Sequence, residues 1–173
     1  MNSIAWWPVL IAVVIASITD LRTRRIPNML VLPLLIGGVI VSTYAGGWGG
    51  LGESLLGIGL GAAVMGVLCF LGGMGMGDAK LCAAVGAWIG PQQLLLALVV
   101  MGLVGGVITL VMAWWGGFLG ESLDGAGDLL AGFGKRGLKP HPRLVLSNPR
   151  AKSLPYAPAI AIGVIFSFFG GMK

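Results

Sequence analysis

The chain has 173 residues, of which 57% are hydrophobic and only 10% are charged, and its mean hydropathy is +0.96. Soluble domains hold about 25% charged residues, so this composition excludes a water-soluble globule, a disordered segment and a disulfide scaffold. The net charge of +5 comes from basic residues clustered in a few polar segments of a very apolar chain, which indicates membrane orientation and not nucleic-acid binding.

Six apolar runs follow one another along the chain. A bilayer core needs about 20 apolar residues as a helix, and lipid cannot satisfy free backbone groups, so each run is predicted to be helical. The runs are Ile4–Thr19, Met29–Tyr44, Leu51–Leu71, Ala79–Ile89, Leu94–Phe118 and Tyr156–Phe169. No basic residue precedes the first run, so we interpret it as a retained helix and not as a signal peptide. We predict an all-α integral membrane protein, a bundle of about six transmembrane helices in a single domain over residues 1–173.

Basic residues lie almost entirely in three of the polar segments between these runs. They are Arg22, Arg24 and Arg25 after the first run, Lys80 after the third, and Lys135, Arg136, Lys139, Arg143, Arg150 and Lys152 after the fifth. If six helices alternate in direction, these segments share one side of the membrane and only Lys173 lies on the other. The positive-inside rule then predicts that the segments, including a loop at about 119–155, are cytoplasmic and that both termini lie outside.

Small and aromatic residues give a second set of expectations. Glycines four residues apart predict close helix packing, and they are Gly57 and Gly61, Gly86 and Gly90, and Gly102 and Gly106. Tryptophans near the ends of the runs predict membrane-interface positions, and they are Trp6, Trp7, Trp48, Trp88, Trp114 and Trp115. Cys69 and Cys82 are expected to be buried thiols without a disulfide.

Asp20 and Asp78 are acidic residues at the predicted cytoplasmic ends of apolar runs. Taken singly, each is explained as a helix cap, and Asp20 also as a partner of Arg24 or Arg25. Ionisable groups at membrane depth are costly, however, and therefore indicate function. Two carboxyl groups within hydrogen-bonding reach share a proton, so that one can activate a water while the other protonates a carbonyl oxygen. This chemistry hydrolyses peptides without a metal, a cofactor or a covalent intermediate.

Other catalytic arrangements are poorly supported. A Ser-His-Asp triad would need the single histidine, His141, which has no serine in a nucleophile-elbow context. A metal site built from Asp124, Asp128 and His141 has loose spacing among glycines, so we predict no metal.

Two motifs resemble signatures of one protein family. The stretch Asp20–Asn28, DLRTRRIPN, resembles the first signature of the type IV prepilin peptidases, and Gly75–Leu81, GMGDAKL, resembles the second, the GxGD motif with a following lysine. The stretch Leu154–Gly163 is similar to the start of the last helix of that family. The resemblance covers nearly the whole chain in order and spacing.

The resemblance implies an aspartic endopeptidase of the inner membrane. Asp20 and Asp78 would be its catalytic residues, and the supporting motif residues would be Gly75, Gly77, Lys80, Pro27 and Asn28. Lys80 would bind a carbonyl or tune Asp78, or only extend to the interface. Such enzymes remove the basic leader of prepilins or pseudopilins after a glycine at the cytoplasmic face, and need no cofactor. The expected partners are these substrates and membrane lipid, without nucleic acid.

Several alternatives stay open at this point. The chain shows no extension with paired CxxC motifs, so N-methyltransferase activity is not expected, and the short form is similar to peptidases of Flp-type tight-adherence pili and to archaeal preflagellin peptidases. A GxGD intramembrane protease, a small transporter and a pilus-assembly scaffold are further hypotheses. The acidic loop residues either attract the basic leader or are simply solvated, and they are Glu121, Asp124 and Asp128.

Overall fold

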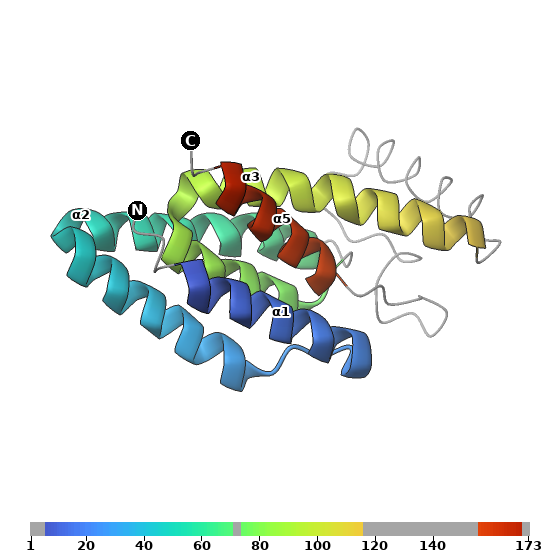
Figure 1. Ribbon diagram of the computed structural model, residues 1–173, viewed down its shortest axis with the longest axis horizontal. Helices are drawn as coiled ribbons and strands as arrows, with labels where there is room; N and C mark the ends of the chain where they lie inside the picture. The colour runs from blue at the N-terminus through green and yellow to red at the C-terminus, as the bar shows by residue number, and fades with distance from the viewer. Residues whose placement is uncertain (1–5, 71–73, 116–155, 171–173) are drawn as a thin grey trace.

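Four helices make up the computed structural model, which describes residues 6–70, 74–115 and 156–170 (Figure 1). They are α1 (Trp6–Thr23), α2 (Asn28–Phe70), α3 (Met76–Trp115) and α5 (Ala157–Gly170). Three of them, α1, α2 and most of α3, are long and apolar enough to cross a membrane, and α5 is a shorter apolar helix. The predicted all-helical, membrane-compatible class is therefore confirmed for the described residues.

Both long helices kink at a glycine. Gly47 has φ 58° and ψ −140°, and Gly90 has φ 75° and ψ 175°. Residues with a Cβ rarely adopt a positive φ, so glycine permits the chain to turn here. Figure 1 shows α2 and α3 each doubling back at the kink, so that each consists of two arms. The kinks fall in the polar breaks that the sequence predicts between the second and third runs and between the fourth and fifth.

The second arm of α2 crosses the first arm of α3 at very short range. A Cβ on Gly57 would collide with the backbone of Gly86, and a Cβ on Gly61 would lie 2.8 Å from the carbonyl oxygen of Cys82. Since the higher number on α2 pairs with the lower number on α3, these two arms are antiparallel. The small-residue prediction is correct for this crossing, because only glycine lets the two backbones touch.

The same prediction is wrong for the remaining glycines. Gly90 forms the kink in α3 and does not serve as a packing residue. A Cβ on Gly102 or Gly106 would meet nothing within 4 Å, so the third pair lies open on the surface of α3. Spacing alone does not distinguish a face that meets another helix from one that meets lipid.

The last helix, α5, packs antiparallel to the second arm of α3. The buried Ser167 hydroxyl donates to the backbone oxygen of Gln93 at 2.9 Å and lies 2.8 Å from its side-chain oxygen. Gly163 lies against the backbone of Ala97. α1 runs along α5 in the opposite direction, because Trp6 at its start stacks edge-on against Phe168 near the end of α5, with ring centroids 5.3 Å apart.

Two tryptophans predicted at the membrane interface are packed inside the bundle instead. Trp6 is buried against Phe168. Trp88 is half-buried, its ring covers Gly37 and Gly38, and its Nε1–H donates to the backbone oxygen of Leu34 at 2.6 Å. The absence of side chains on the two glycines makes room for the indole. The four other tryptophans are exposed, and they are Trp7, Trp48, Trp114 and Trp115.

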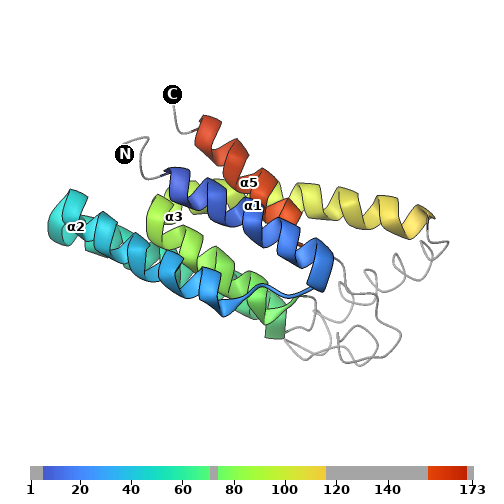
Figure 2. The same cartoon turned by 60° about the horizontal axis from the view of Figure 1, so that its bottom comes forward.

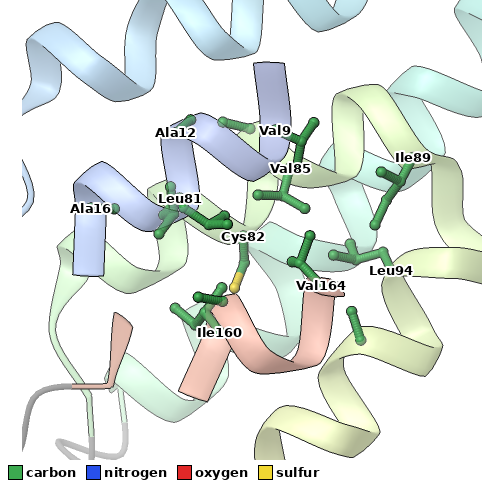
Figure 3. Packing of buried hydrophobic residues seen from close by; sticks show 14 of the residues in the cluster. Val9, Ala12, Ala16, Leu81, Cys82, Val85, Ile89, Leu94, Ile160 and Val164 are labelled. Atoms are coloured by element: carbon green, nitrogen blue, oxygen red, sulfur yellow. The ribbon is translucent and has the colours of Figure 1, made fainter. Parts of the chain in front are cut away.

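The apolar core lies where α1, α3 and α5 meet (Figure 3), and α2 adds Val31, Leu34 and Met65 to it. Val9, Ala12 and Ala16 of α1 face Leu81 and Val85 of α3, and α5 adds Ile160 and Val164. Cys82 is buried in this core as expected, whereas Cys69 is only half-buried, and both are free thiols. The core matters for function because its two main rows of side chains lead to the two aspartates.

Candidate active site

Asp20 and Asp78 each end a buried row of side chains. On α1, Asp20 follows Ala16 by one helical turn on the buried face. On α3, Asp78 precedes the buried residues Leu81 and Cys82 by three and four positions. Because these rows pack against each other, the aspartates arrive at the same place from distant parts of the chain.

The two aspartates line one open pocket of about 340 Å³. Each is only 8% exposed, and they lie near enough to interact electrostatically. The pocket is lined by residues from the end of α1 and the starts of α2 and α3, and the start of α5 contacts Asp20. Figure 2 shows the backbone of these helices. The lining of the pocket consists of Asp20, Arg24, Arg25, Ile26, Asn28, Gly75, Met76, Gly77, Asp78 and Lys80.

Asp20 lies in the last turn of α1, and both its backbone oxygen and its carboxyl group accept a hydrogen bond. Its backbone oxygen accepts from the N–H of Arg24 at 2.8 Å. Arg24 has φ 52°, a left-handed conformation that ends α1 and turns the chain toward α2. The Asp20 carboxyl accepts at Oδ2 from the backbone N–H of Ala157 at 3.3 Å, so the first residue of α5 holds the side chain.

Asp78 belongs to the first turn of α3, where two glycines allow neighbouring groups to pack closely. Its backbone N–H donates to the oxygen of Gly75 at 3.1 Å, which closes the turn that starts the helix. A Cβ on Gly75 would lie 3.4 Å from Asp78 Oδ2, and a Cβ on Gly77 would lie 3.3 Å from the side chain of Ile26. The glycines of the GxGD motif thus let the chain between α1 and α2 pack directly on the turn that carries Asp78.

The two motifs are also joined by a hydrogen bond. Lys80 Nζ donates to Asn28 Oδ1 at 3.3 Å on the exposed side of the pocket. Pro27 supplies the first carbonyl of α2, which accepts from the N–H of Leu30 at 3.0 Å. The sequence predicts Asn28 and Lys80 as motif residues, but their direct contact appears only in the structure.

Some predicted site residues lie outside the described residues. These are Glu121, Asp124 and Asp128 of the predicted cytoplasmic loop, together with His141. Among residues 6–70, 74–115 and 156–170, no group of three His, Cys, Asp or Glu side chains is placed to hold a metal ion.

The sequence pattern does not point to Ala157 or Ile26 as site residues. Ala157 acts through its backbone N–H, and an alanine carries no sequence signal for such a role. Its position at the start of an apolar run, directly before Pro158, is the one available indication, because proline is common in the first turn of a helix. Ile26 packs on Gly77, which a sequence pattern cannot reveal.

This arrangement is suited to acid–base chemistry on a bound amide. Two buried carboxyl groups share a pocket that is open to solvent, and Arg24, Arg25 and Lys80 lie at its exposed side. One carboxylate can take a proton from water while the other, protonated, donates to a carbonyl oxygen.

Comparison with known proteins gives one family match and several similar sequences. Residues 7–110, which include both aspartates, match the type IV leader peptidase family. The chain is also similar to several proteins named prepilin leader peptidase/N-methyltransferase, among them those of Aeromonas salmonicida, Burkholderia pseudomallei and Neisseria gonorrhoeae. It is 39% identical to that of Aeromonas salmonicida (strain A449) over 95 residues, which are 51% of this chain and 32% of that protein.

The other two relatives give comparable matches. The Burkholderia pseudomallei (strain K96243) protein is 31% identical over 112 residues, 61% of this chain and 36% of its own length. The Neisseria gonorrhoeae protein is 36% identical over 100 residues, 54% of this chain and 35% of its own length. The chain therefore spans about a third of each of these relatives. No solved structure matches it significantly.

Proposed function

Because this chain belongs to the type IV leader peptidase family, we propose that it is a membrane aspartic endopeptidase of the inner membrane. Its substrates are prepilins or pseudopilins, and it removes their basic leader after a glycine, before the apolar helix of the substrate. Asp20 and Asp78 are its catalytic residues. The curated relatives, which are named for leader peptidase activity, support this assignment.

One observation carries the proposal: the two buried aspartates, from distant motifs, line the same open pocket. Burying two carboxyl groups in a membrane bundle is costly, and a bundle without a function for them would replace them with apolar residues. A shared pocket with access to solvent gives them both a water molecule and an amide to act on.

The location of the pocket also suits a substrate that has a soluble leader and a membrane helix. We propose that α1, both arms of α2, both arms of α3, and α5 each cross the membrane, in alternating directions. The antiparallel contacts between Gly57 and Gly86 and between Gly163 and Ala97 support this alternation. The pocket end then carries Arg22, Arg24, Arg25 and Lys80, which favours the cytoplasmic side. A leader held in the cytoplasm and a helix held in lipid would place the scissile bond at this pocket.

The decisive experiment uses a precursor peptide with a lysine-rich leader, a glycine and an apolar helix, incubated with the purified protein in detergent. Asp20→Asn and Asp78→Asn should each lower kcat at least about a thousandfold, because the reaction needs both carboxyl groups and the loss of either one disables the pair. Glu53→Gln is the matched control, since Glu53 is an exposed acid beside the Gly90 kink, away from the pocket.

Two further measurements separate this function from the alternatives. Cleavage should continue in excess EDTA, because the proposed reaction uses no metal ion. Mass spectrometry of the products should place the cut directly after the glycine. A cut inside the apolar helix would instead indicate an intramembrane protease, and normal cleavage by either asparagine variant would exclude that residue from catalysis.

A further inference from the structure

The start of α5 reaches into the pocket and supplies a donor to one of the two aspartates. The amide N–H of Ala157 donates to Asp20 Oδ2 at 3.3 Å in a buried position. Ala157 itself is fully buried. The first backbone hydrogen bond of α5 runs from the N–H of Ile160 to the oxygen of Tyr156 at 3.1 Å. The N–H of Ala157 comes before this bond, so it does not take part in the hydrogen bonds of the helix and can bind a group outside it.

The position of Asp20 on its own helix gives such a donor a role. Asp20 lies in the last turn of α1, where the unpaired carbonyls create a negative end. Its neighbour Asp78 adds a second acid. The N-terminus of α5 carries the opposite partial charge, and a hydrogen bond from a backbone N–H to a carboxylate favours the ionised form.

The other charged groups at the pocket are less suited to this role. Among the described residues they are Arg24 at the end of α1, Arg25 before α2, and Lys80 on α3. All three side chains are exposed, so water screens their charges. From α2 the pocket receives the neutral Asn28, and the half-buried Cys69 thiol of α2 donates to the backbone oxygen of Gly75 at 3.2 Å. The Ala157 N–H is therefore the buried hydrogen-bond donor that distinguishes the carboxyl group of Asp20 from that of Asp78.

We propose that the N-terminus of α5 is a positioning element of the peptidase, in which the Ala157 N–H fixes Asp20 and makes it the negatively charged member of the pair. The proposal rests on the function proposed above. It assigns the two roles: Asp20 is the general base, and Asp78 holds the shared proton as the general acid.

The reaction then balances as follows. Asp20 takes a proton from the bound water, whose oxygen forms a bond to the carbonyl carbon, while Asp78 gives its proton to the carbonyl oxygen. When the tetrahedral intermediate collapses, the carbon–nitrogen bond breaks and the proton on Asp20 passes to the leaving nitrogen. The hydroxyl that received the proton from Asp78 returns it, which restores the starting state.

The test removes this hydrogen-bond donor and keeps the side chain of residue 157. In the full-length protein, Ala157 is replaced by lactic acid through nonsense suppression, which exchanges the N–H for an ester oxygen of nearly the same shape. Replacement of Ala159 by lactic acid is the matched control, because Ala159 is an equally buried alanine in the first turn of the same helix. Ala157→Pro is a second way to remove the N–H, with Ala157→Gly as the variant that keeps it.

The first readout needs no substrate. Carboxyl-¹³C-labelled aspartate reports the titration of the four aspartates of the chain, and the signal that is lost in Asp20→Asn identifies Asp20. The Ala157 ester should raise the titration midpoint of this signal by about one pH unit, since a hydrogen bond to the charged form is lost. The Ala159 ester should leave it unchanged. An equal midpoint in both esters would overturn the proposal.

The second readout is the pH profile of precursor cleavage. The acid limb of kcat/KM should move to higher pH by the same amount in the Ala157 ester and in Ala157→Pro, but not in Ala157→Gly or the Ala159 ester. A purely structural role would lower the rate at every pH without moving the limb. If the unmodified protein cut no precursor, the proposed function would fail, while the carboxyl titration would still decide the role of Ala157.

Discussion

At the scale of the residue, the most telling side chains are polar groups buried in an apolar bundle. Asp20, Asp78, Ser54 and Ser167 are the buried polar residues of the described chain. Three of them have an evident use: the aspartates line the pocket, and Ser167 bonds to Gln93. Ser54 differs, because its hydroxyl has no hydrogen-bond partner among the described residues. Within residues 6–70, 74–115 and 156–170, Ser54 is therefore the polar group whose burial lacks a compensating hydrogen bond.

The two serines should respond oppositely to the loss of the hydroxyl. Ser54→Ala should stabilise the protein by about 1 kcal/mol, because it removes an unsatisfied buried group, whereas Ser167→Ala should destabilise it by about 1 kcal/mol. Unfolding in increasing SDS, followed by circular dichroism, measures both. The explanation fails if the two variants shift the midpoint in the same direction.

At the scale of the element, glycine decides how the long helices divide and meet. Gly47 and Gly90 turn α2 and α3 back on themselves, and Gly57 and Gly86 let the resulting arms touch. The arm crossing matters for the site because the first arm of α3 carries Asp78 at its start. A shift of this arm would move Asp78 relative to Asp20.

Gly57→Ala should separate the two arms. Its Cβ would collide with the backbone of Gly86, so we expect a loss of about 1–3 kcal/mol of unfolding free energy together with reduced precursor cleavage. Gly59→Ala, two residues away with nothing within 4 Å of its Cβ, should change stability by less than about 0.5 kcal/mol. Thermal denaturation in detergent compares the two, and equal stability would contradict the described crossing.

At the scale of the whole molecule, the helix ends sort into two groups. The end of α1 and the starts of α2 and α3 line the pocket, and the start of α5 contacts Asp20. The kinks in α2 and α3 lie at the other ends of the first arms of these helices, which Figure 1 shows doubling back. The basic residues Arg22, Arg24, Arg25 and Lys80 belong to the pocket end. If each arm crosses the membrane as proposed, the pocket and the kinks face opposite compartments.

Cysteine labelling tests this orientation. In a background with Cys69→Ser and Cys82→Ala, Trp48→Cys at the first kink and Arg25→Cys at the pocket provide single exposed thiols. A membrane-impermeant maleimide should label Trp48→Cys in spheroplasts and Arg25→Cys in inverted vesicles, because impermeant reagents reach one side only. Labelling of both from the same side would contradict the proposed crossings.

The helical runs, the breaks between them and the candidate pair of aspartates are predictable from the residue order, because hydropathy, glycine and isolated charge are local properties of the chain. The residue order does not determine which glycine faces meet another helix, that Trp6 and Trp88 pack inside, or that Ala157 donates to Asp20. These contacts join segments far apart in the chain, and they depend on how small and large side chains fit together across helices. Complementary packing is a property of pairs of surfaces, so only the tertiary structure decides it.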